Sequence, residues 1–80
     1  MSDIDRLLDA VAEIAGRHQL TAKEREILSA AFHGNSAKEF VAERGVSINT
    51  YKSQVRKLLR KLGAGSLGYV RDAVLRALSS

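Results

Sequence analysis

Five cations lie between Ser47 and Gly63 with no acidic residue among them: Lys52, Arg56, Lys57, Arg60 and Lys61. Lys and Arg bind phosphate oxygens, and Arg, Lys and Asn also pair with base edges in the major groove of DNA. Asn49 and Gln54 lie in the same segment. The segment is therefore typical of a surface that binds nucleic acid. A solvated face that only aids solubility is the alternative, although acids normally intersperse among the cations of such a face.

The distribution of charge along the chain supports the same reading. The net charge is +4. Residues 1–46 carry six Lys/Arg against eight Asp/Glu, whereas residues 47–80 carry seven Lys/Arg against Asp72 alone. A single-sign half on a small domain favours a polyanionic partner.

Other chemistries lack the residues they need. The chain has no cysteine, and its two histidines, His18 and His33, are far apart in sequence, so no metal site is expected. Gly63, Gly65 and Gly68 follow a predicted helix rather than a strand, which excludes a dinucleotide-binding loop. No cofactor is expected. A chain of 80 residues folded into short helices leaves little room for a catalytic pocket, so we do not expect an enzyme.

Length and composition indicate one small domain. The chain has 80 residues, of which 45% are hydrophobic and 28% charged, a balance typical of folded domains. No apolar run approaches the ~20 residues of a membrane span. The N-terminal segment, MSDIDRLLDA, begins with acids and lacks the pattern of a signal peptide. We therefore expect a cytoplasmic protein without a membrane partner.

Capping residues and apolar spacing predict an all-α fold, a small bundle of about five short helices. Residues 1–19 form an amphipathic N-terminal helix, which Ser2 caps and Gly16 ends, and residues 20–80 form one compact unit. Thr21 with Glu24 and Ser36 with Glu39 are capping boxes that open the second and third helices. Ser47 and Ser66 cap the fourth and fifth helices. No segment alternates over a strand's length, so no sheet is expected.

The third and fourth helices predict a helix-turn-helix. A helix at 37–44 is followed by a tight turn at Gly45-Val46 and a helix from Ser47 to Gly63. The apolar residues expected on the buried face of the helix from Ser47 to Gly63 are Tyr51, Val55, Leu58, Leu59 and Leu62. On the outer face, Asn49, Lys52 and Arg56 are candidates for base contacts, since the N-terminal half of such a helix faces base edges. The cationic flanks, Lys57, Arg60 and Lys61, are candidates for phosphate contacts.

Several pieces of the chain resemble the LuxR/GerE-type helix-turn-helix domain of bacterial transcription regulators. They are LTAKEREIL, SAKEF and SINTYKSQVRKLLRKLG, within roughly Leu20 to Val74. The resemblance implies base-facing positions for Lys52, Ser53 and Arg56, and phosphate contacts for Lys38, Thr50 and Lys57. It also implies that the last helix, 66–78, forms dimers. The N-terminal helix lies outside the resemblance.

Two departures from the family pattern are informative. The aliphatic residue that commonly follows the Thr is Tyr51 here, and the Leu that ends the third helix is Arg44. A buried Arg44 would be costly unless paired, so we expect its charged end to reach the surface.

The terminal helices each have two interpretations. The apolar stripe of the first helix either completes the core or packs against another protein. The last helix likewise is core or dimer seam, and we favour a two-fold dimer. Its candidate dimer or partner residues are Leu67, Val70, Val74, Leu75 and Leu78.

Two functional hypotheses follow. The first is a stand-alone transcription regulator that binds specific sequences of double-stranded DNA as a homodimer. The second is a helix-turn-helix relative that binds another regulator or RNA polymerase. The DNA-reading region of sigma factors is a weaker third resemblance.

Overall fold

The computed structural model describes residues 3–79, and within them the fold is five helices without a strand. The helices are α1 (Asp3–Arg17), α2 (Ala22–Phe32), α3 (Ala37–Arg44), α4 (Ile48–Leu62) and α5 (Leu67–Ser79). The predicted all-α bundle is confirmed. The predicted cap at Ser2 lies outside the described residues.

The helix boundaries follow local capping chemistry. Both predicted capping boxes are present, Thr21 with Glu24 on α2 and Ser36 with Glu39 on α3. Ser66 also caps α5 as predicted, since its hydroxyl oxygen accepts from the Tyr69 N–H at 3.0 Å. These side chains satisfy backbone N–H groups that the first turn of a helix leaves unpaired.

The predicted end of α1 is wrong by a short distance. Gly16 lies inside the helix, which continues to Arg17. The chain reverses at Gln19, whose φ of 53° is in the left-handed region, and the Leu20 N–H then bonds the Ala15 carbonyl oxygen at 3.0 Å. Gly16 has no positive φ, so its conformational freedom is not needed there.

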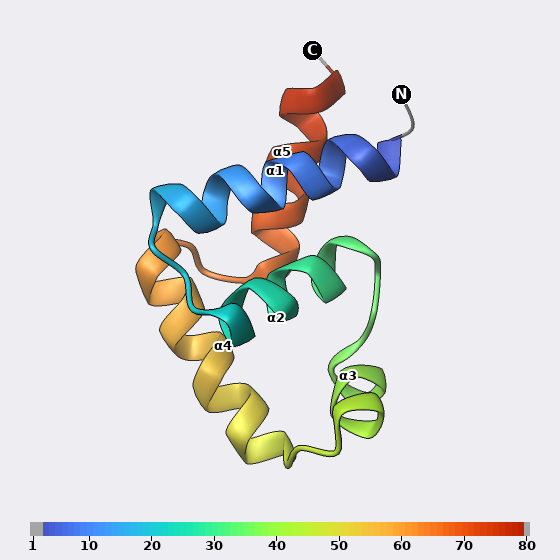
Figure 1. The fold of residues 1–80 in the computed structure, drawn as a ribbon, viewed down its shortest axis with the longest axis vertical. Coiled ribbons are helices and arrows are strands. Elements are labelled where there is room, and N and C mark those ends of the chain that lie inside the picture. Colours follow the sequence, from blue (N-terminus) through green and yellow to red (C-terminus); the bar gives the residue numbers. More distant parts are fainter. Residues whose placement is uncertain (1–2, 80) are drawn as a thin grey trace.

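One hydrophobic core joins all five helices. Its buried side chains are Leu7, Val11, Ile27, Leu28, Phe32, Phe40, Leu58 and Val70. Helix α2 is central to the bundle, with α1, α4 and α5 packed around it, while α3 contacts α4 (Figure 1). Helix α1 therefore completes the core, which was the first of the two interpretations of this segment.

The molecule is elongated, with extents of 37 × 23 × 20 Å. The start of α1 and the end of α5 lie at one end of the molecule, and the turn between α3 and α4 lies at the other (Figure 1). The acidic first helix is thus separated from the start of the basic fourth helix. No helix in the described part of the chain is long and apolar enough to span a membrane.

Candidate nucleic-acid interface

The turn that joins α3 to α4 depends on Gly45. This residue caps α3 in the left-handed conformation, with φ 65° and ψ 31°. Its N–H and that of Val46 both donate to the Val41 carbonyl oxygen, at 3.0 and 3.3 Å. A residue with a side chain is strained at this φ, so glycine is suited to the tight reversal. The predicted helix-turn-helix is formed as a result.

The N-terminus of α4 is fixed by a serine cap. Ser47 has extended backbone angles, φ −75° and ψ 154°, and its Oγ accepts from the Thr50 N–H at 3.1 Å. The Ser47 hydroxyl also donates to Thr50 Oγ1 at 2.9 Å. At the other end Gly63 closes the helix in the left-handed conformation, and Arg60 and Lys61 lie in the last turn. Cations in this turn complement the negative end of the helix dipole.

The inner face of α4 holds the helix against the bundle. Leu58 is fully buried, and Tyr51, Val55, Leu59 and Leu62 pack partly buried against the core. The Tyr51 ring meets the Phe40 ring of α3 with centroids 5.3 Å apart and planes tilted by 44°. Partial burial raises the pKa of the Tyr51 hydroxyl above its usual 10.0. The aromatic pair thus connects the two helices of the motif.

The outer face of α4 is exposed along its length. It carries Asn49, Lys52, Ser53, Arg56, Lys57 and Arg60, all exposed. Gln54, the other amide of the segment, is half-buried instead. Within residues 3–79 the four cations of this set have no ion-pair or hydrogen-bond partner. They form a row of free positive charge, which we call the outer cation row: Lys52, Arg56, Lys57 and Arg60.

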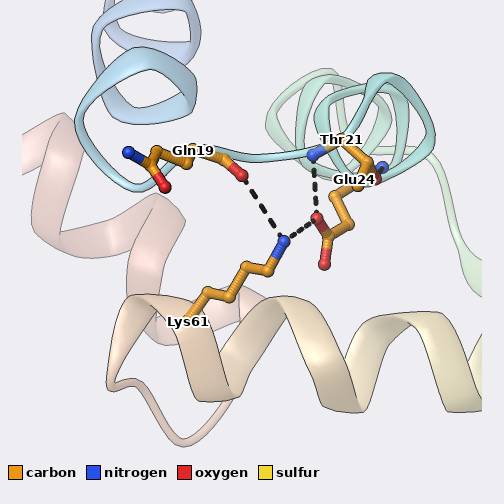
Figure 2. Close-up of polar contacts among 4 residues, drawn as sticks. All are labelled: Gln19, Thr21, Glu24 and Lys61. Atoms are coloured by element: carbon orange, nitrogen blue, oxygen red, sulfur yellow. Dashed lines mark hydrogen bonds and ion pairs between the residues drawn. The ribbon is translucent and has the colours of Figure 1, made fainter.

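Lys61 differs from the other predicted phosphate contacts because its charge is paired with a carboxylate of the same chain. Its ammonium donates to Glu24 Oε1 at 2.7 Å and to the Gln19 carbonyl oxygen at 3.4 Å (Figure 2). Glu24 is only 5% exposed. Burial alone raises the pKa of this carboxyl, but hydrogen bonds from Lys61 and Thr21 and the Lys61 charge outweigh it, so the pKa lies below its usual 4.5. The pair ties the start of α2 to the end of α4.

Two residues of α3 also bear on the interface. Lys38 is exposed near the start of the helix, as a phosphate contact requires. Arg44 is exposed as expected: its guanidinium donates to Glu26 Oε2 at 3.0 Å and lies 5.3 Å from the centroid of the Phe40 ring. Arg44 therefore joins α3 to α2 without a buried unpaired charge.

The predicted partner residues of α5 face the chain's own core. Val70 is 9% exposed and belongs to the core, and its contact with a partner stays a prediction. Leu67, Val74, Leu75 and Leu78 are half-buried and packed against the same core. Their contact with a second copy remains a prediction. On the outer side of α5, Tyr69 is 63% exposed.

Sequence reasoning missed two features near α4. Lys23 of α2 lines a cleft of about 540 Å³ together with Gln54, Lys57, Arg60 and Lys61. Lys23 belongs to the LTAKEREIL segment that resembles the family. The spacing of residues within that segment does not show that Lys23 lies beside α4. Ile48, the first residue of α4, is 42% exposed although it is a large aliphatic residue.

No metal site accompanies these residues. Among residues 3–79 no group of His, Cys, Asp or Glu side chains is arranged to hold a metal ion. His33 instead places its Nδ1 2.7 Å from the Ser29 carbonyl oxygen, near the end of α2. The chemistry of the interface is therefore that of cations, amides and hydroxyls.

Comparison with known families agrees with this geometry. The family described as "Bacterial regulatory proteins, luxR family" (GerE) matches residues 18–72, more than half of the chain. The chain belongs to this family, and it is a helix-turn-helix domain of the DNA-binding, transcription-regulating kind. The family is not one of enzymes. No curated protein and no solved structure matches the chain.

Proposed function

We propose that the chain regulates transcription by binding specific DNA sequences through α4. The observation that carries this proposal is the outer cation row, which is exposed and unpaired on a helix fixed at both ends by caps. A helix about 10–12 Å across fits the ~12 Å major groove of B-DNA. The protein would act in the cytoplasm, where bacterial DNA lies.

The outer face of α4 divides into two kinds of contact. Asn49, Lys52, Ser53 and Arg56 are the proposed base-facing residues, and Arg56 can donate both arms of its guanidinium to guanine O6 and N7. Lys38, Thr50, Lys57 and Arg60 are the proposed phosphate contacts. Lys61 supports the interface indirectly, because its charge is engaged with Glu24. Phosphate contacts fix position, whereas base contacts select sequence.

A pair of single substitutions tests this division. Arg56→Ala should weaken binding to the preferred duplex by about 1–3 kcal/mol and relax the choice at one base pair. Lys57→Ala should weaken binding to all duplexes alike and lower the slope of log K against log salt by about 1. The measurement is a fluorescence-anisotropy titration of preferred and scrambled duplexes from about 50 to 200 mM salt.

Arg17→Ala is the matched control, because Arg17 is an exposed cation on α1 that pairs with Glu13 and lies outside the interface. It should leave both affinity and salt slope unchanged. If the unmodified protein binds no duplex at low salt, DNA recognition is excluded, and capture of RNA polymerase or another regulator becomes the function to test.

The proposal includes a homodimer. Leu67, Val74, Leu75 and Leu78 are half-buried, so a two-fold contact through α5 would use the part of these side chains that the core leaves exposed, together with Tyr69, which is 63% exposed. The chain has a mass of 8.7 kDa, so native mass spectrometry separates monomer from dimer without ambiguity. A monomer on a single half-site at all concentrations would contradict this part of the proposal.

A further inference from the structure

Ile48 is an exposed aliphatic residue at the start of the proposed reading helix. The other apolar side chains of α4 are buried or packed against the core, whereas Ile48 is 42% exposed and outside that cluster. Helix α4 begins at this residue, directly after the Ser47 cap. An exposed isoleucine on a polar, cationic face therefore lies where the N-terminal residues of a recognition helix meet base edges.

The Ile48 side chain belongs neither to the core cluster nor to the helix cap. The cap consists of the bonds between Ser47 and Thr50, to which the Ile48 side chain contributes nothing. Ile is also a poorer helix former than Ala or the straight-chain residues, so propensity does not favour it at the first helical position. Neither core packing nor helix initiation accounts for Ile48.

The free groups of the first turn are complementary to one kind of base pair. The Ser47 hydroxyl donates to Thr50 Oγ1, and Thr50 is a proposed phosphate contact, so the groups left for a base pair are the aliphatic group of Ile48 and the exposed amide of Asn49. Ile48 also shares a row with two cations, because residues four apart lie on one side of a helix: Ile48, Lys52 and Arg56. The apolar group thus continues the reading face toward the helix N-terminus.

An A·T pair offers partners for both free groups in the major groove. Adenine N6 and N7 pair with an Asn amide, and the thymine C5-methyl group accepts apolar contact. We propose that the first turn of α4 reads an A·T pair, with Ile48 packed on the thymine methyl group and Asn49 on adenine. This inference rests on the proposed DNA-binding function and makes Ile48 a specificity-determining residue of that site.

Removing the methyl group from DNA tests the contact directly. A preferred duplex is first selected from a random pool, and each of its thymines is then replaced singly by deoxyuridine, which pairs identically but lacks the C5-methyl group. For the unmodified protein, one replacement should weaken binding about fourfold, the worth of one buried methyl-sized group. In Ile48→Ala the same replacement should have no effect, and Ile48→Val should retain part of the sensitivity.

Leu8→Ala is the matched control, because Leu8 is a large aliphatic residue of α1 with an exposed fraction of 43%. It should keep the fourfold sensitivity. The inference is overturned if no thymine is methyl-sensitive, or if Ile48→Ala remains as sensitive as the unmodified protein while circular dichroism shows it folded. Those results leave the proposed function intact, whereas absence of any selected duplex removes the function itself.

Discussion

Glu24 is a buried carboxylate whose charge is compensated from two directions. The Thr21 N–H donates to its Oε1 at 2.8 Å, and Lys61 donates to the same oxygen at 2.7 Å (Figure 2). The Lys61 side chain is 38% exposed, so its own charge stays partly solvated. Breaking such a pair from the Glu side leaves a lysine that water can reach, whereas breaking it from the Lys side leaves a buried anion.

The lowered pKa of Glu24 makes stability depend on acid pH. Because the folded pKa lies below the usual 4.5, the charged form contributes stability at neutral pH, and this contribution is lost as pH falls below 4.5 toward the folded pKa. Glu24→Gln should lower the free energy of unfolding by about 1–3 kcal/mol near neutral pH and remove this part of the acid dependence. Urea denaturation at a series of pH values measures both effects.

Glu13→Gln provides the comparison, since Glu13 forms an exposed pair with Arg17, with side chains 69% and 70% exposed. Exposed pairs contribute little, so this variant should follow the unmodified protein. Equal acid dependence in Glu24→Gln and the unmodified protein would show that the Glu24 charge does not stabilise the fold.

Some of these residue roles were predictable and others were not. The capping role of Glu24 follows from its position three residues after Thr21 and is confirmed. Its bond with Lys61 joins residues 37 apart in sequence, and no local pattern shows which distant cation will approach a capping carboxylate. The sequence therefore predicted Lys61 only as a flanking cation and candidate phosphate contact, and its bond with Glu24 could not be foreseen.

At the scale of elements, local chemistry determines most boundaries. The caps at Thr21, Ser36, Ser47 and Ser66 are confirmed, because each serine or threonine is followed by a helix whose first N–H groups it can satisfy. The wrong prediction that Gly16 ends α1 also came from local chemistry. Glycine tolerates a helix end without requiring one, and here Gln19 adopts the positive φ instead.

Two glycines should therefore respond to alanine with opposite sign. Neither has an atom within 4 Å of the position that a Cβ would take, so backbone conformation alone decides the outcome. Gly45→Ala forces a side chain onto φ 65° and should cost about 1–2 kcal/mol. Gly16→Ala lies within α1 and should stabilise by about 0.5–1 kcal/mol. Thermal or urea unfolding of both variants measures the difference, and a loss of stability in Gly16→Ala would contradict this account.

At the scale of the whole molecule, α1 and α5 form the end opposite the α3–α4 turn (Figure 1). The Arg6 guanidinium donates to the Leu78 carbonyl oxygen at 2.6 Å, so the two helices are joined by a polar contact as well as by the core. An amphipathic stripe in the sequence shows that a helix buries one face but not what covers it. Both terminal helices consequently had two interpretations, and the shared core decides that α1 packs on its own chain.

If α1 is part of the fold, its buried face should contribute to global stability. Val11 is 2% exposed, and removing two methyl groups by Val11→Ala should lower the free energy of unfolding by about 2 kcal/mol, with a single cooperative transition retained. Leu8→Ala, on the same helix at 43% exposure, should cost much less. Urea denaturation followed by circular dichroism compares the two variants. A cavity in one helix lowers the stability of the entire domain only if that helix is part of the shared core. Equal costs for the two variants, or a separate early transition for α1, would therefore mean that residues 20–80 fold without α1.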